Sequence, residues 1–336
     1  MKGLLSDLFM GTIRKTVVAG VFCILLMVLI NFVLPRTMPG DPVLLLVGAE
    51  EESLNRDLYE SYKEKLGLDL PLHIQYFRYL GSVLRGDLGF SYHHKAPVSS
   101  VIKARIPATL RIAVPAIFLS TILALLLGCY TGWRANSPID TAISSVITLL
   151  NAVPSFLLGM VFVTLFSYHL RWFPLGGLNS IIVPSGVIPA FLDRVRHTVL
   201  PIATMTIYGT PAKYLMARNT AAAAKNEKYV VYARARGLSK RRILFIHILK
   251  NICPPFITLV GMNIGFMIAG SMIIEVVFSI NGMGGLTYNA VSLRDFPMLQ
   301  GCLMVVSVLV IAANIVTDLM NRFIDPKQRY GVHRET

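Results

Sequence analysis

The feature that most constrains this fold is a series of uncharged, apolar stretches long enough to cross a lipid bilayer. Residues 17–34 form the first of them, a run of 18 residues without a charged side chain. As an α-helix this run is about 27 Å long, close to the thickness of the hydrocarbon core. Because backbone groups must pair internally in lipid, such stretches predict membrane-spanning helices.

Composition and charge support the same interpretation. Of the 336 residues, 54% are hydrophobic and 15% are charged, whereas soluble domains carry about a quarter of charged residues. The net charge of +14 could suggest binding to nucleic acid. Many of the basic residues, however, flank the apolar stretches, which is the pattern that orients membrane proteins. We therefore expect no nucleic-acid partner.

The apolar stretches predict an all-α integral membrane protein with six spans. Pro154 interrupts the third span, where it kinks the helix and frees a carbonyl group. The fourth reaches Lys213 after too few residues to cross alone, so we expect that side chain to extend to the membrane surface while the helix continues. Residues 170–197, with prolines in their apolar part, predict an external re-entrant or surface segment. The expected spans are 17–34, 112–132, 141–168, 199–218, 252–274 and 296–317.

Four parts follow along the chain. Residues 1–35 form an N-terminal anchor helix. A signal peptide is the competing interpretation, but its apolar core would be shorter and a small-residue cleavage site would follow, in place of PRTMPGDP. Residues 36–105 carry charges of both signs and predict a small extracytoplasmic domain with helices at 54–66 and 72–84. A helical core at 106–325 and a basic cytoplasmic tail at 326–336 complete the chain.

A basic, polar loop at 220–251 separates the fourth and fifth spans. One acid, Glu227, stands among eight Lys or Arg residues, an imbalance that places the loop and both termini in the cytoplasm. Ala221–Ala224 favour a helix, Gly237 favours a break, and Ser239 is a candidate cap for a second helix. The basic residues are Lys225, Lys228, Arg234, Arg236, Lys240, Arg241, Arg242 and Lys250.

The chain contains no familiar catalytic pattern. It has no Walker A sequence, no HExxH, no paired cysteines and no nucleophile elbow. His93 and His94 could bind a metal but are more typical of a solvated loop. Glu275 and Asp318 are the acids nearest the membrane interior, where acids can couple transport to ions. The four cysteines are predicted to be small core residues: Cys23, Cys129, Cys253 and Cys302.

The segment YVVYARARGLSKRRILFIHILKNICPP resembles the cytoplasmic coupling loop of binding-protein-dependent ABC importer permeases. It is most similar to the peptide and nickel branch, of the dipeptide and oligopeptide permease B type. Tyr229 and 233–238 match the branch pattern, while Val231 and Tyr232 replace the Glu and the first Ala of the general pattern. Other matches follow in family order: PGDP, LGLDLP, QYFRYL, GDLGFS, RIPATL, VPSFLLG, LPIAT, RDFPMLQG and DPKQRY. Asn281-Gly282 stands where the family has Pro-Gly.

This resemblance implies a six-span permease of the type I ABC importer kind, with no cofactor of its own, in a bacterial or archaeal cytoplasmic membrane. The implied partners are a second homologous permease, two cytoplasmic ATPases that bind ATP and Mg²⁺, an extracytoplasmic solute-binding protein and membrane lipid. The implied solute is a di- or oligopeptide. The expected ATPase-docking residues are Tyr229, Ala233, Arg234, Ala235, Arg236, Gly237 and Leu238, and the candidate translocation-path residues are Asn151, Ser155, Met262, Asn263 and Asn314.

Three alternatives stay open at this point. An ion-coupled secondary transporter would use Glu275 or Asp318 and need no ATPase. A membrane scaffold would use the basic loop to recruit a partner without moving a solute. An importer of the same class could carry nickel or a metal chelate instead of a peptide.

Overall fold

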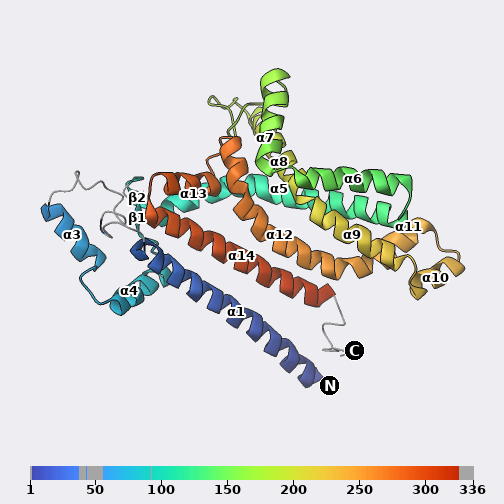
Figure 1. Ribbon diagram of the computed structural model, residues 1–336, viewed down its shortest axis with the longest axis horizontal. Coiled ribbons are helices and arrows are strands. Elements are labelled where there is room, and N and C mark those ends of the chain that lie inside the picture. Colours follow the sequence, from blue (N-terminus) through green and yellow to red (C-terminus); the bar gives the residue numbers. More distant parts are fainter. Residues whose placement is uncertain (1, 38–42, 44–55, 92, 325–336) are drawn as a thin grey trace.

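The computed structural model describes residues 2–37, 43, 56–91 and 93–324, most of which are helical. Four long helices run side by side along the longest axis of the molecule (Figure 1). They are α1 (Lys2–Thr37), α5 (Val98–Trp133), α12 (Leu249–Val277) and α14 (Phe296–Ile324). The all-α architecture expected from the apolar stretches is confirmed.

Shorter elements connect the long helices. At one end lie α3 (Arg56–Leu66), α4 (Leu72–Leu84) and the antiparallel strands β1 (Phe90–Ser91) and β2 (Ala96–Pro97); at the other end lie α10 (Lys228–Ala235) and α11 (Lys240–Arg242). The remaining helices are α6 (Pro138–Ala152), α7 (Ser155–Phe162), α8 (Val187–Gly209), α9 (Pro211–Ala224) and α13 (Met283–Ser292), with the π-helical segments η2 (Val163–His169) and η3 (Ile243–Ile248).

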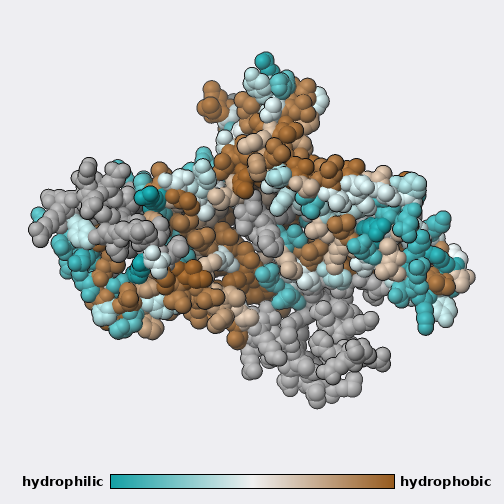
Figure 2. Space-filling model, viewed as in Figure 1, coloured by the Kyte–Doolittle hydropathy of each residue, from teal (hydrophilic) through white to brown (hydrophobic). Residues whose placement is uncertain are grey.

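The surface divides into a hydrophobic middle and two hydrophilic ends. Figure 2 shows hydrophobic residues along α1, α12 and α14 and on the projecting α7–α8 region, with hydrophilic residues gathered around α3–α4 and around α10–α11. By length and composition, α5 and residues 296–320 of α14 can cross a membrane, and the bent pair 138–152 and 155–169 can form a third span. The shorter apolar helices 18–33 and 255–264 lie within α1 and α12. These counts refer to the described residues.

The third expected span bends by 98° between α6 and the segment α7–η2. Pro154 has no N–H group and disfavours helical backbone in the residue before it. Val153 is accordingly extended, with φ −82° and ψ 124°. The expected kink is confirmed, and α7 leaves the bundle almost at a right angle (Figure 1).

The fourth expected span differs from the prediction. Its helix, α8, begins at Val187 rather than near 199, and α9 follows as a separate helix after Thr210. The expectation that Lys213 extends to the membrane surface is wrong, because its side chain is fully buried. Its Nζ donates to the Ser120 hydroxyl at 2.5 Å, so a hydroxyl on α5 supplies the acceptor that the membrane surface was expected to supply.

The segment between α1 and α5 is anchored to the bundle at two points. Arg36 of α1 donates to Oε1 of Gln75 in α4 at 2.7 Å. Ser91 of β1 donates to the buried Asp295 carboxylate, which also accepts the Met298 N–H at the start of α14. The helices expected at 54–66 and 72–84 are confirmed as α3 and α4. The tail at 326–336 lies outside the described residues.

Candidate functional site

The basic loop turns a corner at Gly237, directly after α10. Gly237 has a φ of +74°, which lies in the left-handed region. Its N–H donates to the Arg234 carbonyl at 2.9 Å, and the Leu238 N–H donates to the Ala233 carbonyl at 3.2 Å. This pair of bonds is the Schellman motif, whose left-handed residue is favourable for glycine because it has no Cβ. The expected break at Gly237 is confirmed.

A second helix begins immediately after the corner. The Ser239 hydroxyl accepts the Arg242 N–H at 3.4 Å, which satisfies one of the free N–H groups at the start of α11. The chain then continues through η3 into α12 without a loop. The expected cap at Ser239 is confirmed, and the corner is joined directly to a long membrane helix.

One side of α10 is buried in the bundle. Val230 is completely buried and Ala233 almost completely. Tyr229 and Leu238 pack against the same cluster from the edge. The main packing partner of α10 is η3. α9 and α12 contribute to the same cluster, whose other buried members include Tyr214, Ala217, Ala221, Ala224, Ile243, Ile248, Ile252 and Phe256.

The other side of α10 is exposed and carries both apolar and basic groups. Val231 is 54% exposed and Tyr232 is 70% exposed. Arg234 and Arg236 are exposed on the same short helix and its cap. The Arg234 guanidinium lies 4.8 Å from the centre of the Trp133 ring at the end of α5, which orients that side chain. This face can accept an apolar partner surface edged with acidic groups.

The seven expected docking residues divide between these two sides. Arg234, Ala235, Arg236 and Gly237 are exposed, whereas Ala233 is buried and Tyr229 and Leu238 are half-buried. Sequence reasoning missed Val231 and Tyr232 as surface residues. Helical spacing could have found them, because positions one and two residues after a buried Val230 point away from it.

The cluster beneath α10 continues into a close crossing of α5 and α9. A Cβ atom added at Gly128 would lie 2.7 Å from the Cβ of Ala217, and one added at Gly132 would lie 2.7 Å from the Cβ of Ala221. Small residues four apart on both helices let the two backbones approach closely, as in many membrane helix pairs. Any side chain at Gly128 or Gly132 would separate the helices.

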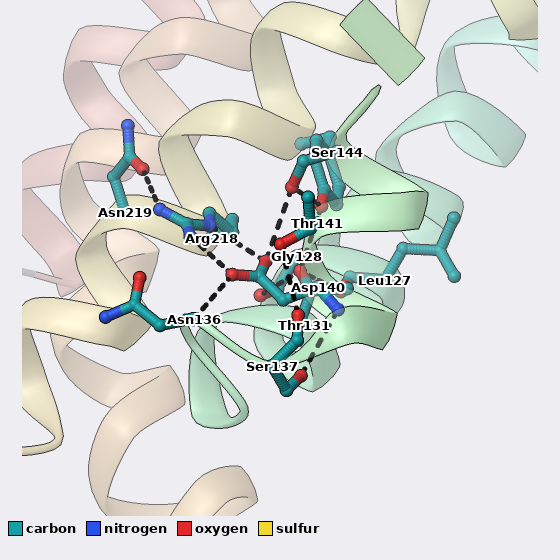
Figure 3. A network of polar contacts seen from close by, with 11 residues as sticks. Leu127, Gly128, Thr131, Asn136, Ser137, Asp140, Thr141, Ser144, Arg218 and Asn219 are labelled. Carbon is teal, nitrogen blue, oxygen red and sulfur yellow. Dashed lines mark hydrogen bonds and ion pairs between the residues drawn. The ribbon is translucent and has the colours of Figure 1, made fainter. Parts of the chain in front are cut away.

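A polar network beside this crossing connects α6 to α9 (Figure 3). The buried Asp140 carboxylate accepts from Nε of Arg218 at 3.0 Å and from Nη2 of the same side chain. It also accepts the Asn136 N–H at 2.9 Å and the Ser144 hydroxyl at 3.3 Å. The Tyr214 hydroxyl lies 2.8 Å from Oγ of Ser144. Charge-assisted bonds of this kind are the stronger hydrogen bonds of proteins, so α6 is oriented by α9.

The five candidate path residues lie on different elements. They come from three regions: Asn151 and Ser155 flank the bend at Pro154, Met262 and Asn263 lie on α12, and Asn314 lies on α14. Gly159 of α7 lies against Val277 of α12, about 20 Å along that helix from Met262. Asn151, Met262 and Asn314 are exposed, while the Asn263 amide donates to a carbonyl of its own helix at 2.8 Å.

Glu275 is fully buried where α12, α5 and α13 meet. Its Oε1 accepts from the Thr109 hydroxyl at 2.7 Å and the Ser271 hydroxyl at 3.1 Å. Its Oε2 accepts the Gly285 N–H at 3.0 Å, in the first turn of α13. A Cβ at Gly282 would overlap this carboxylate. Glu275 therefore caps α13 and ties it to two long helices.

The other candidate polar groups form no site within the described residues. Asp318, His93 and His94 are exposed. No group of three or more His, Cys, Asp or Glu side chains in this part of the chain could hold a metal ion. All four cysteines are free. Cys129 and Cys302 are buried as expected, whereas Cys253 is half-buried and Cys23 is exposed.

Two protein-family models match almost the whole chain. The model of the binding-protein-dependent transport system inner membrane component matches residues 107–330, and the model of the N-terminal part of such components matches residues 9–113. The chain belongs to this family. This ABC permease is a membrane-spanning transport subunit of an inner membrane and is not an enzyme in itself.

Relatives of this permease share its full length. The oligopeptide transport system permease protein AppB of Bacillus subtilis is 30% identical over 95% of this chain and 98% of its own length. The di/tripeptide transport system permease protein DppB of Pseudomonas aeruginosa is 33% identical over 90% and 94%. The glutathione transport system permease protein GsiC of Salmonella paratyphi A is 30% identical over 91% and 95%.

Solved structures agree on the fold. A chain of the MetNI methionine ABC transporter, in inward-facing conformations, aligns with a TM-score of 0.51 and 15% identity, covering 67% of this permease and 96% of that chain. At this identity the likeness concerns the fold alone. It supports the type I importer architecture that the loop pattern predicted.

Proposed function

We propose that this permease subunit carries di- or oligopeptides into the cell as part of an ATP-driven importer. The support is that full-length relatives are named for oligopeptide, di/tripeptide and glutathione transport. The proposed complex has a second homologous permease, two cytoplasmic ATPases that bind ATP and Mg²⁺, and an extracytoplasmic solute-binding protein. Both termini and the α10 corner lie on the cytoplasmic side in this proposal, with α3, α4 and the β-hairpin outside.

The observation that carries the proposal is the exposed face of α10 on a rigid support. Val231 and Tyr232 offer apolar area to a groove on an ATPase, and Arg234 and Arg236 offer charges to acidic groups at its edge. Interface cores are enriched in tyrosine and arginine. The buried side of the helix, with Val230 at its centre, prevents α10 from yielding when it is pushed.

Movement of α10 has a continuous route into the membrane. α10 packs on η3, which leads into α12, and α12 packs on α9. α9 crosses α5 at the small-residue contact, and Arg218 of α9 holds Asp140 of α6. Closure of the ATPase pair on ATP would therefore move several helices together as a rigid body. ATP biases the transporter between inward-open and outward-open states because it binds more tightly to the closed pair.

Replacing Gly237 by proline tests the docking role. Proline fixes φ near −65° and removes the N–H that bonds Arg234, so the Schellman corner cannot form. We expect normal membrane insertion, loss of the ATPase subunits on affinity purification, and at least a tenfold fall in ATP-dependent peptide uptake in proteoliposomes. Gly86→Pro is the matched control, because Gly86 has a φ of +78° and the same pair of bonds at the end of α4.

The control should retain the ATPases, since α4 lies at the opposite end of the molecule. If the Gly237→Pro variant transports normally, the docking role is wrong. Tyr232→Ser provides a test that leaves the corner intact, because this side chain is 70% exposed. We expect it to weaken ATPase binding about tenfold, and unchanged binding would contradict the assigned face.

A further inference from the structure

Helix α6 divides into a polar half and an apolar half. With about 100° between successive residues, its polar side chains fall within one arc of about 140°. They are Asp140, Thr141, Ser144, Ser145, Thr148 and Asn151. The opposite arc holds Ile139, Ile143, Val146, Ile147 and Leu150. A helix of this pattern has two different environments on its two sides.

The two halves line different hollows. The apolar half lines a half-open hollow of about 370 Å³ together with residues of α5 and the α8–α9 junction, including Leu123 and Ile207. The polar half lines an open groove of about 650 Å³, whose wall includes Ser145, Thr148 and Arg218. The polar half therefore faces a space that a solute can enter.

Two of the polar side chains along this groove, Ser145 and Thr148, keep their hydrogen-bonding capacity free among the described residues, whereas Thr141 and Ser144 are bonded. On other helices, the hydroxyls of Thr204, Ser307 and Thr317 donate to the carbonyl four residues earlier. Ser145 and Thr148 make no such bond, nor any other side-chain hydrogen bond to a described group. A hydroxyl left unpaired in lipid is unfavourable by several kcal/mol, so this face needs water or a polar solute against it.

The groove is also electrically neutral. Its two charged residues, Asp140 and Arg218, bind each other through two hydrogen bonds. Besides the apolar side chains of Leu149 and Ala152, the wall offers a solute hydroxyl groups and the Asn136 amide, which both donate and accept. These groups can hydrogen-bond to the N–H and C=O that every peptide bond carries. Because they are neutral, they do not distinguish positively from negatively charged peptide side chains.

We propose that the polar half of α6 is this subunit's wall of the translocation path and that it contacts passing peptides through their backbone. The inference rests on the proposed function of peptide import, because it names the face that meets the peptide. It also implies that charge selection among peptides does not take place at this wall. Ser145 and Thr148 are the contacting side chains, and Asp140 with Arg218 orients the helix that carries them.

Thiol labelling of the assembled importer tests where the face lies. The four native cysteines are replaced by alanine, and single cysteines are introduced by Thr148→Cys, Ser145→Cys and, as the matched control, Val146→Cys in the apolar half. We expect a charged, membrane-impermeant methanethiosulfonate to modify the first two at least tenfold faster than the control. Binding protein loaded with tri-alanine should slow the modification of Thr148→Cys during ATP turnover.

Equal and slow labelling of all three thiols would overturn the proposal, because the face would then lie against lipid or a partner subunit. Labelling can be measured without transport, so a failure of the proposed wall can be distinguished from a failure of the proposed peptide import. If the unsubstituted complex shows no ATP-dependent peptide uptake while the polar thiols label fast, the peptide import function fails and the water-exposed wall stands.

A charge introduced into the wall tests the contact with peptide. A unit charge at about 4 Å in water changes an equilibrium about fivefold. Thr148→Lys should therefore lower the uptake of tri-lysine relative to tri-aspartate by at least fivefold, while Val146→Lys, if the complex assembles, should leave the ratio unchanged. An unchanged ratio in an assembled Thr148→Lys complex would overturn the contact.

Discussion

Two buried carboxylates stand at different regions of this permease, and their partners differ. Asp140, near the α10–α11 end, meets the guanidinium of Arg218. Glu275, at the start of α13, meets the hydroxyls of Thr109 and Ser271 and the Gly285 N–H. One group is held by an opposite charge and the other by neutral donors alone.

The difference shows two ways to keep an acid inside a membrane protein. An ion pair requires that Asp140 be ionised, because a neutral side chain would leave Arg218 without its counter-charge. The hydroxyl and N–H groups around Glu275 are neutral and need only acceptor oxygens. A negative charge on Glu275 is therefore not essential to hold them. The first arrangement links two helices that move together in the proposed mechanism, and the second fixes the start of a short helix.

The largest effect is expected from removing the carboxylate at the neutral site. Glu275→Ala leaves the buried Thr109 hydroxyl and the Gly285 N–H without the acceptor they share, which should lower the free energy of unfolding by about 3 kcal/mol. Unfolding in detergent, followed by the fluorescence of Trp133 and Trp172, measures this. Glu227→Ala, at an exposed acid without a side-chain bond at the start of α10, is the control, and equal stability of the two variants would contradict the cap.

An intermediate effect is expected from replacing the ionised acid by its amide. Asp140→Asn turns one acceptor into a donor that faces Arg218 or the Asn136 N–H, which should lower the free energy of unfolding by about 2 kcal/mol. The double variant Asp140→Asn with Arg218→Gln should lose less than the sum of the single losses. Additive losses would show that the two side chains do not interact.

The smallest effect is expected from the same amide exchange at the neutral site. Glu275→Gln keeps one accepting oxygen for the Gly285 N–H, and its amide can donate to a hydroxyl that rotates, so the loss should be below about 1 kcal/mol. The same unfolding measurement compares it with Asp140→Asn. If Glu275→Gln is the more damaging of the two, the contrast between charged and neutral sites is wrong.

Local patterns predicted much of the fold. The C-terminal end of α4, the corner at Gly237 and the cap at Ser239 follow from capping chemistry within a few residues of the chain. Pro154 predicted a kink, but the 98° bend was not predictable, because its size depends on how α7 packs against α8 and α12. Lys213 was expected at the membrane surface because no acceptor for its ammonium group lies nearby in the sequence. The acceptor in the structure, the Ser120 hydroxyl, is 93 residues away.

By itself, the sequence determined that this chain is a membrane protein, where most of its apolar helices lie and which family its loop resembles. Those properties depend on hydropathy, periodicity and motifs that are read along the chain. The tertiary structure decided which polar groups are buried and which face is left open. Asp140 meets Arg218 across 78 residues and Thr109 meets Glu275 across 166. Such partners are chosen by packing, because only the folded bundle brings distant donors and acceptors within hydrogen-bonding distance.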